Sequence, residues 1–221
     1  RAHFYKDLDA DVAALAAREL ERIGSLGVVL VEVDIPDVDK AGPTIGRPLF
    51  MAEIAEDLAR YLAASGAPVT LEEVVAGVAS PDVAKLVAIQ FDPARRAEFE
   101  AARREALEVH RPRLRAAYAH CFEVHAIRAL IFPTTAIPAR PIGEDETTML
   151  GGVSVPTTAA YTRNTGPATA VGLPGLSLPI GLTPGGLPVG IELDGPEGSD
   201  RDLIGMALAW EARCPPPPRY G

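Results

Sequence analysis

The chain has 221 residues, of which 48% are hydrophobic, and it carries a formal charge of −9 with a sequence pI of about 5.0. This composition is typical of a globular protein with a sizeable core and excludes a disordered chain. The acidic balance disfavours a nucleic-acid binder, because phosphate contacts need clustered basic residues and the arginines between positions 95 and 115 are interleaved with glutamates.

The two cysteines, Cys121 and Cys214, provide no disulfide framework, so we expect a reducing compartment and a cytoplasmic location. No apolar run is long enough to span a bilayer, and we expect no membrane association. The first residues contain neither a signal-peptide core nor an initiator Met, which suggests that the chain does not start where its gene starts.

The first 35 residues predict a helix followed by a strand. Asp9 is suited to cap a helix that runs to Ile23, because apolar residues recur at helical spacing along this stretch. Two glycines end the helix, and the apolar sequence VVLVEVDI at 28–35 predicts a buried strand. A helix, a glycine turn and a buried strand together are typical of an α/β sheet.

Residues 36–126 predict a largely helical block. Its expected helix starts show one of three signals: a proline in the first turn, a capping residue followed directly by a proline, or a capping residue with a glutamate three positions later. These starts are Pro48, Thr70, Ser80 and Asp92. We expect the last helix to reach Ala126, with a bend or break near Pro112.

The next segment predicts a short strand with polar residues at its end. Residues 129–132 are apolar and stop at Pro133, and Thr134 and Thr135 follow directly. Strand ends in α/β sheets are common ligand positions. Residues 143–166 predict an irregular loop, and residues 164–172 predict a short helix.

The region rich in glycine and proline from 172 to 196 predicts two strands. Residues 176–180 and 188–194 alternate with period two, and TPGG at 183–186 supplies a turn between them. In the second strand, the apolar residues face one side, whereas Gly190, Glu192 and Asp194 face the other. An amphipathic helix is expected over 198–212, and the proline-rich tail predicts an extended strap.

No reactive centre can be assembled from these residues alone. Ser177 lies in GLSLP, which is not a nucleophile elbow, so it is interpreted as a strand residue. His120 and His125 are five residues apart, which places them on different faces of a helix and disfavours a metal site. Glycine-rich nucleotide cradles are missing as well, so we expect neither a metal nor another cofactor.

Several motifs in the correct order make the chain resemble the amidase signature family. The motifs are RAHFYKDLDADVAAL (1–15), ASPDV (79–83), FPTT (132–135), NTGP (164–167), GLPGLSLPIG (172–181), GLPVGIELDGP (186–196) and GSDRDL (198–203). Two of them, ASPDV and FPTT, are similar to the arylacetamide, mandelamide and indoleacetamide hydrolase branch. The resemblance covers nearly the whole chain.

The resemblance implies a three-layer α/β/α domain with a mixed central sheet, and an active site built from a nucleophilic Ser, a second Ser on a cis peptide and a Lys. None of this machinery is visible here: no two serines are adjacent, and Lys6, Lys40 and Lys85 lie in other settings. Residues 1–221 are therefore interpreted as the C-terminal portion of one amidase-signature domain, whose catalytic residues lie in an N-terminal half.

The resemblance also suggests what this portion contributes. Thr134, Thr135, Asn164 and Thr165 are polar groups at predicted strand or helix ends and are candidates for the wall of the substrate pocket; bracing of turns is an equally good interpretation. The implied partners are a small-molecule amide and the N-terminal half, with a homodimer possible.

Three functions remain open at this point. The first is amide hydrolysis together with the N-terminal half. The second is a non-catalytic fragment or pseudoenzyme that binds or supports another protein. The third is a subunit of the glutamine amidotransferase A type.

Overall fold

In the computed structural model, which describes residues 2–144 and 146–213, the first helix is α1 (Ala10–Ser25). The Asp9 side chain accepts a hydrogen bond from the N–H of Asp11 at 2.9 Å, so the predicted N-cap is confirmed. One face of α1 buries Val12, Leu15 and Ala16 against the sheet.

The central sheet has the strand order β1-β5-β4, and both of its strand pairs are antiparallel. Its strands are β1 (Leu130–Pro133), β4 (Gly175–Leu182) and β5 (Pro188–Asp194), as the sequence predicts to within two residues. Pro179 lies at a register shift and Pro188 begins its strand, because a proline has no N–H to donate to the ladder.

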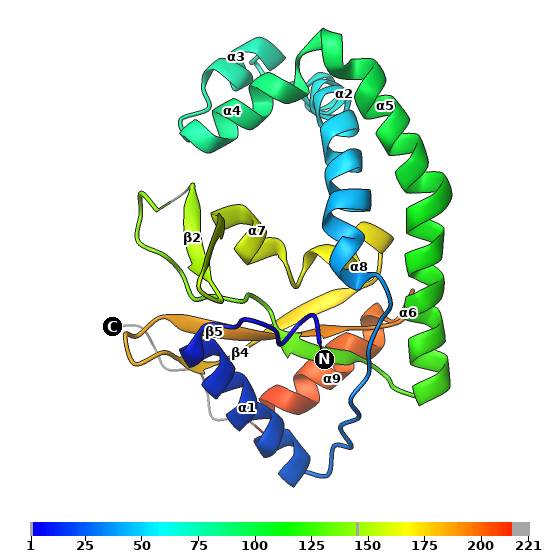
Figure 1. Cartoon of the computed structure of the whole chain (residues 1–221), viewed down its shortest axis with the longest axis vertical. Helices are drawn as coiled ribbons and strands as arrows, with labels where there is room; N and C mark the ends of the chain where they lie inside the picture. The colour runs from blue at the N-terminus through cyan, green and yellow to red at the C-terminus, as the bar shows by residue number, and fades with distance from the viewer. Residues whose placement is uncertain (1, 145, 214–221) are drawn as a thin grey trace.

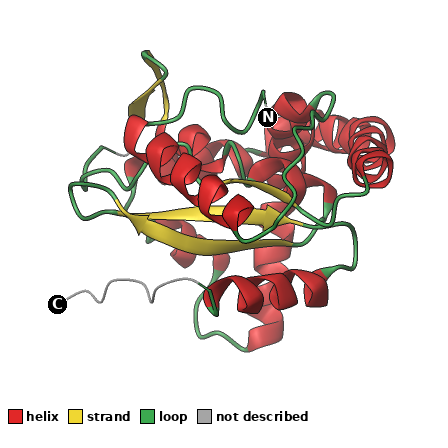
Figure 2. Cartoon of the chain, turned by 90° about the horizontal axis from the view of Figure 1, so that it is seen from below, coloured by secondary structure: helices red, strands yellow, loops and turns green. Residues whose placement is uncertain are grey.

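Helices cover both faces of this sheet, so the predicted α/β class with three layers is confirmed (Figure 1). On one face, Ile191 and Leu193 pack with α1 and with α9 (Asp200–Glu211). On the other face, Leu130 and Phe132 pack with α6 (Arg111–His125) and α8 (Gly166–Val171). Figure 2 looks from below, from the side on which Figure 1 places α1 and α9.

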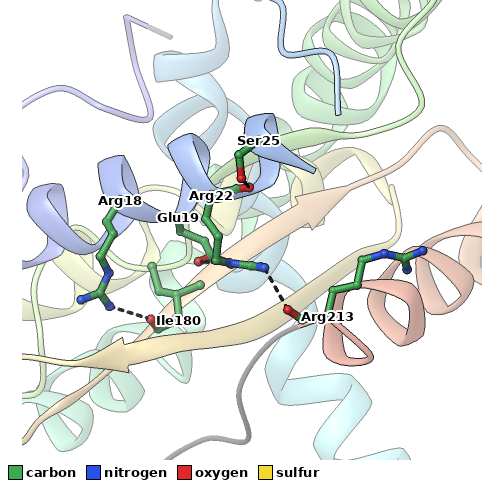
Figure 3. A network of polar contacts seen from close by, with 6 residues as sticks. All are labelled: Arg18, Glu19, Arg22, Ser25, Ile180 and Arg213. Carbon is green, nitrogen blue, oxygen red and sulfur yellow. Dashed lines mark hydrogen bonds and ion pairs between the residues drawn. The ribbon is translucent and has the colours of Figure 1, made fainter. Parts of the chain in front are cut away.

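Polar contacts fix α1 to its neighbours (Figure 3). Arg18 donates to the carbonyl of Ile180 in β4 at 3.3 Å, and Arg22 donates to the carbonyl of Arg213 beyond α9 at 3.3 Å. Glu19 accepts two hydrogen bonds from the Arg22 guanidinium, at 2.9 and 2.6 Å, which holds that side chain in position.

A second body of helices stands away from the sheet in Figure 1. It contains α2 (Arg47–Ser65), α3 (Leu71–Ala76), α4 (Pro81–Gln90) and α5 (Arg96–Glu105). The capping box of Thr70 and Glu73 is present as predicted, and Arg103 of α5 donates to Glu53 of α2 at 2.7 Å. Short 3-10 turns occupy Val38–Lys40 and Pro93–Arg95, and a π-helical turn occupies Gly42–Gly46.

The predicted irregularity near Pro112 is a π-helical turn. Residues Ala106–His110 make this turn between α5 and α6, and Pro112 lies in the first turn of α6. Because proline supplies no N–H, the regular hydrogen-bond ladder cannot run through this point, and the helix adjusts without a break.

Two predictions about secondary structure were wrong. Residues 143–166 are not an irregular loop, because they contain the hairpin β2 (Thr147–Leu150) and β3 (Val153–Pro156) and the helix α7 (Thr157–Thr162). Residues 28–35 form no strand, because no described strand pairs with them. Val29 is 85% exposed there, and Ile35 is the one apolar residue of this segment that is buried.

The C-terminal end and the lengths of the helices bear on two further predictions. The predicted strap at 214–221 and Cys214 lie outside the described residues. Within the described part of the chain, no helix combines the length and the apolar character needed to cross a membrane.

Candidate functional site

Four side chains form a polar strip on the sheet face that α6 and α8 cover. They are Thr134 just beyond β1, Ser177 on β4, and Glu192 and Asp194 on β5. Their position follows from the alternation along β5, where Val189, Ile191 and Leu193 pack on the opposite face.

A hydroxyl pair forms one end of the polar strip. The Oγ atoms of Thr134 and Ser177 lie 2.5 Å apart, and either can donate. Gly190 lies beneath them, and a Cβ atom at that position would be 2.7 Å from Ser177 Oγ and 3.0 Å from Thr134 Oγ1. Glycine at 190 therefore makes room for the hydroxyl pair.

A buried carboxyl pair forms the other end. Asp194 is fully buried and Glu192 is 8% exposed, and the ladder pairs them with Gly175 and Ser177 of β4. Burial first, and then the charge of Glu192, raise the pKa of Asp194 to about 8. Burial likewise raises the pKa of Glu192.

The Asp194 carboxyl group has few polar partners. Apart from Glu192, no described residue offers the Asp194 oxygens a hydrogen-bond partner. Tyr118 of α6 is also fully buried, and its pKa is raised by burial and by the charge of Asp194. The neutral form of Asp194 is therefore favoured in the folded protein near neutral pH.

Asn164, one of the predicted pocket residues, has a bracing position. It is fully buried, and its Nδ2 donates to the carbonyls of Phe4 at 3.1 Å and Pro133 at 2.6 Å. Its Oδ1 accepts a hydrogen bond from Nε of Arg163 at 3.2 Å. Asn164 therefore ties the N-terminal residues to the end of β1, next to Thr134.

The two remaining predicted pocket residues are partly buried. The Thr135 hydroxyl donates to the carbonyl of Ile137 at 2.8 Å, which braces the turn after β1. Thr165 precedes α8, and its carbonyl accepts a hydrogen bond from the Thr169 hydroxyl at 2.9 Å. The four predicted residues thus belong to two segments, 134–135 and 164–165, that meet at Pro133.

A large cavity lies at the open edge of the sheet, away from these residues. It has a volume of about 780 Å³ and is lined by residues 28–35, residues 125–132 and the facing sides of α1 and α9. We call this cavity the edge groove. None of the four predicted pocket residues is among the described residues that line it.

The polar strip lacks a complete catalytic set. The described hydrogen-bond partner of Ser177 is Thr134, which is not a base, and this agrees with its interpretation as a strand residue. Lys40 pairs with Asp37 and Lys85 pairs with Glu146, both in exposed positions elsewhere. Among the described residues, no three His, Cys, Asp or Glu side chains come close enough to hold a metal ion.

Sequence reasoning missed part of this arrangement. It placed Glu192 and Asp194 on the correct face but did not anticipate their burial or the contact between Ser177 and Thr134. Their burial could have been predicted, because Glu192 and Asp194 stand at i and i+2 on a strand whose two faces were both expected to be covered by helices.

The comparisons with known proteins agree with one another. The family model described as Amidase matches residues 1–204. An indoleacetamide hydrolase of Agrobacterium vitis is 40% identical over 211 residues, which are 95% of this chain and 44% of that protein. A mandelamide hydrolase of Pseudomonas putida is 33% identical over 231 residues, covering 98% of this chain and 44% of that protein.

A solved structure gives the same picture. A crystal structure of an amidase matches with a TM-score of 0.71 at 25% identity, covering 95% of this chain and 43% of that one. The chain thus spans a little under half the length of the relatives and of the solved structure that it matches.

Proposed function

Because the chain belongs to the amidase family, we propose that residues 1–221 are the C-terminal portion of a single amidase-signature domain that hydrolyses a carboxamide to a carboxylate and ammonia. The observation that carries this proposal is the unequal coverage: nearly the whole chain matches an indoleacetamide hydrolase, yet it matches only 44% of that protein. A Ser-cisSer-Lys centre in an N-terminal half supplies the chemistry.

The reaction is an acyl transfer in two steps. The serine oxygen of the N-terminal half attacks the amide carbonyl, the C–N bond breaks, and ammonia leaves with the proton relayed from the nucleophile. Water then attacks the acyl ester and releases the carboxylate. Backbone N–H groups stabilise the oxyanion in each step.

This chain contributes scaffold and part of the substrate pocket. Thr134 carries the partly exposed hydroxyl at the end of β1, where polar groups of α/β proteins often meet ligands. Asn164 and Thr135 hold the neighbouring backbone, and Thr165 starts the adjacent helix. In the proposal, Thr134 contacts the substrate and the other three residues position the pocket wall.

An arylacetamide is the proposed substrate class. The support is the similarity to indoleacetamide and mandelamide hydrolases, whose names specify an aromatic group near the amide. A cytoplasmic location is part of the proposal and rests on the low cysteine count.

The test combines this chain with the upstream region of its gene in one polypeptide. Ammonia release is measured with indole-3-acetamide, mandelamide and glutamine. We expect release from the aryl amides by the combined polypeptide and none by this chain alone. The proposal would be overturned if none of the three amides released ammonia, or if the upstream region contained no Ser-Ser-Lys set. Release from glutamine alone would favour the amidotransferase alternative.

The Thr134→Val variant of the combined polypeptide tests the pocket. Loss of one substrate hydrogen bond should lower kcat/KM by roughly tenfold. Thr44→Val is the matched control, because the Thr44 hydroxyl donates to the Lys40 carbonyl in an exposed position and does not belong to the polar strip. Equal kcat/KM values in the two variants would remove Thr134 from the pocket.

A further inference from the structure

The helices α3 and α4 form a segment with little buried surface, residues 71–90, which we call the flap. No described side chain of α3 is buried, and among the described side chains of α4 the buried one is Gln90 at the C-terminal end. Both helices lie against α2, where Gln90 donates to the Phe50 carbonyl at 3.4 Å. Because local stability follows the number of buried apolar contacts, the flap can move at a small cost in free energy.

The chain can bend on both sides of the flap. On the side before it, Gly66 ends α2 with a φ of +65°, which favours glycine, and an added Cβ atom would meet no atom within 4 Å. On the side after it, residues 90–93 line a cavity of about 230 Å³ together with α2 and α5. A glycine at one end and loose packing at the other allow the two connections to act as hinges.

An ion pair joins the flap to the β2–β3 hairpin. Lys85 Nζ on α4 lies 2.6 Å from Glu146 Oε1, directly before β2, and the two residues are 61 positions apart. In Figure 1, α4 lies above β2. The two side chains are 69% and 66% exposed, so water and salt screen their attraction. Exposed pairs of this kind change an equilibrium by about fivefold or less, which suits a contact that forms and breaks repeatedly.

The hairpin side of this contact is braced. The Glu146 carbonyl accepts the N–H of Thr157, the first residue of α7, at 3.2 Å, and the Thr157 hydroxyl donates to the Glu144 carbonyl at 3.1 Å. At the hairpin turn, a Cβ atom on Gly151 would lie 2.6 Å from Cγ of Asp7, so the N-terminal residues pack closely against this turn. The flap is therefore the side of the ion pair that moves.

The flap also contains a motif that the proposed function leaves unexplained. The motif is ASPDV at 79–83, and its proline, Pro81, begins α4. A proline at the first helical position fixes where a helix starts. Lys85 follows Pro81 by four residues, which is about one helical turn, so the motif sets the position of Lys85 on α4.

We propose that the flap is a lid on the hairpin that exchanges between a closed state and an open state. In the closed state Lys85 pairs with Glu146, and in the open state this pair is broken and the flap has rotated about its two connections. Ionic strength shifts the ratio of the two states, because salt weakens the exposed pair. This inference goes beyond the proposed function and does not depend on it.

A distance between two spin labels measures the ratio of the two states. The labels are placed at Ala88→Cys on α4 and Ser154→Cys on β3, both at exposed positions, in the combined polypeptide with its accessible native cysteines replaced. Raising the KCl concentration from about 0.1 M to about 1 M should increase the long-distance population by about two- to fivefold. A single narrow distance at both concentrations would overturn the lid.

Reversal of charge tests the ion pair itself. Lys85→Glu places two like charges together and should raise the long-distance population at low salt, whereas the double variant Lys85→Glu/Glu146→Lys restores opposite charges and should return most of it to the short distance. Arg60→Glu is the matched control, because Arg60 pairs with Asp57 in an exposed position inside α2. Equal effects of Lys85→Glu and Arg60→Glu, or no recovery in the double variant, would overturn the inference.

The outcomes separate the lid from the proposed function, because the distances are measured without substrate. A distance that ignores salt and charge reversal, in a protein that hydrolyses amides, removes the lid and leaves the function standing. A distance that responds to both, in a protein that hydrolyses no amide, supports the lid while the function fails.

Discussion

Gly190 stands in the interior of β5 because only a glycine leaves room for the two hydroxyls above it. A side chain there would meet the hydroxyls of Thr134 and Ser177 at 2.7–3.0 Å. Gly190→Ala should force this pair apart and lower the free energy of unfolding by about 1–3 kcal/mol in urea titrations.

Gly205→Ala is the matched control for this change. Gly205 lies within α9 with open space around it, and alanine favours the helix by about 1 kcal/mol over glycine. The two Gly→Ala changes should therefore move the stability in opposite directions. A stabilising Gly190→Ala would contradict the packing of the polar strip.

The buried carboxyl pair predicts an unusual dependence of stability on pH. The pKa of Asp194 is raised to about 8 in the folded chain, against about 3.9 for an unfolded aspartate. The folded state thus binds the proton more tightly, so its stabilising effect is complete below pH ~4 and is lost as the pH rises toward 8.

Asp194→Asn should remove most of this loss. Urea titrations at pH 5 and pH 8.5 should show a smaller difference in the free energy of unfolding for the variant than for the parent chain. The remaining difference comes from Glu192, whose pKa is also raised. Asp57→Asn on α2 is the control, because that carboxylate is exposed and pairs with Arg60. An unchanged pH dependence in Asp194→Asn would rule out Asp194 as its source.

At the scale of the element, the N-cap of α1 has a measurable effect. Asp9 satisfies one of the free N–H groups of the first turn, and its replacement by alanine typically costs about 1 kcal/mol. We expect a decrease of this size for Asp9→Ala and a change below about 0.5 kcal/mol for Glu21→Ala on the exposed face of α1. Thermal unfolding monitored by circular dichroism measures both.

Elements with a local cause were the ones that the sequence predicted well. The cap of α1, the capping box of α3 and the turn at 183–186 depend on side chains within a few positions, and all three are present. The hairpin of β2 and β3 also had a local signal, Gly151–Gly152, whose φ values are +58° and +81°. Two glycines between alternating residues are typical of a two-residue hairpin turn, and this signal was overlooked.

Elements with a distant cause were predicted less well. The composition of 28–35 predicts a strand correctly as a preference, but a strand also needs a partner to complete its hydrogen bonds. No described strand pairs with this segment, and its residues 28–32 are exposed. The same limit applies to the polar strip, because the contact of Thr134 with Ser177 joins residues 43 positions apart.

At the scale of the whole molecule, the exposed wall of the edge groove predicts self-association. Open strand edges and apolar surfaces pair with other chains. Light scattering should therefore show an average mass that rises with the concentration of the isolated chain. A compact monomer at all concentrations would contradict this expectation.

Val29→Lys should reduce that rise, because Val29 is 85% exposed in the edge groove and a lysine there repels a second copy. Val124→Lys is the control, since Val124 is 60% exposed on α6 and is absent from the described lining of the groove. Equal association of both variants would assign the contact to another surface.

The uninterrupted rod from α5 through the π-helical turn to α6 connects the distant helices with the sheet. At 1.5 Å per residue, it is ~45 Å long, so a tilt of about 5° at the sheet would displace its far end by roughly 4 Å. The rod therefore converts a small rotation at the sheet into a larger displacement at its far end. A small tilt of the rod at the sheet, near Tyr118, would produce a larger displacement at α2, because Arg103 of α5 is bonded to Glu53 of α2.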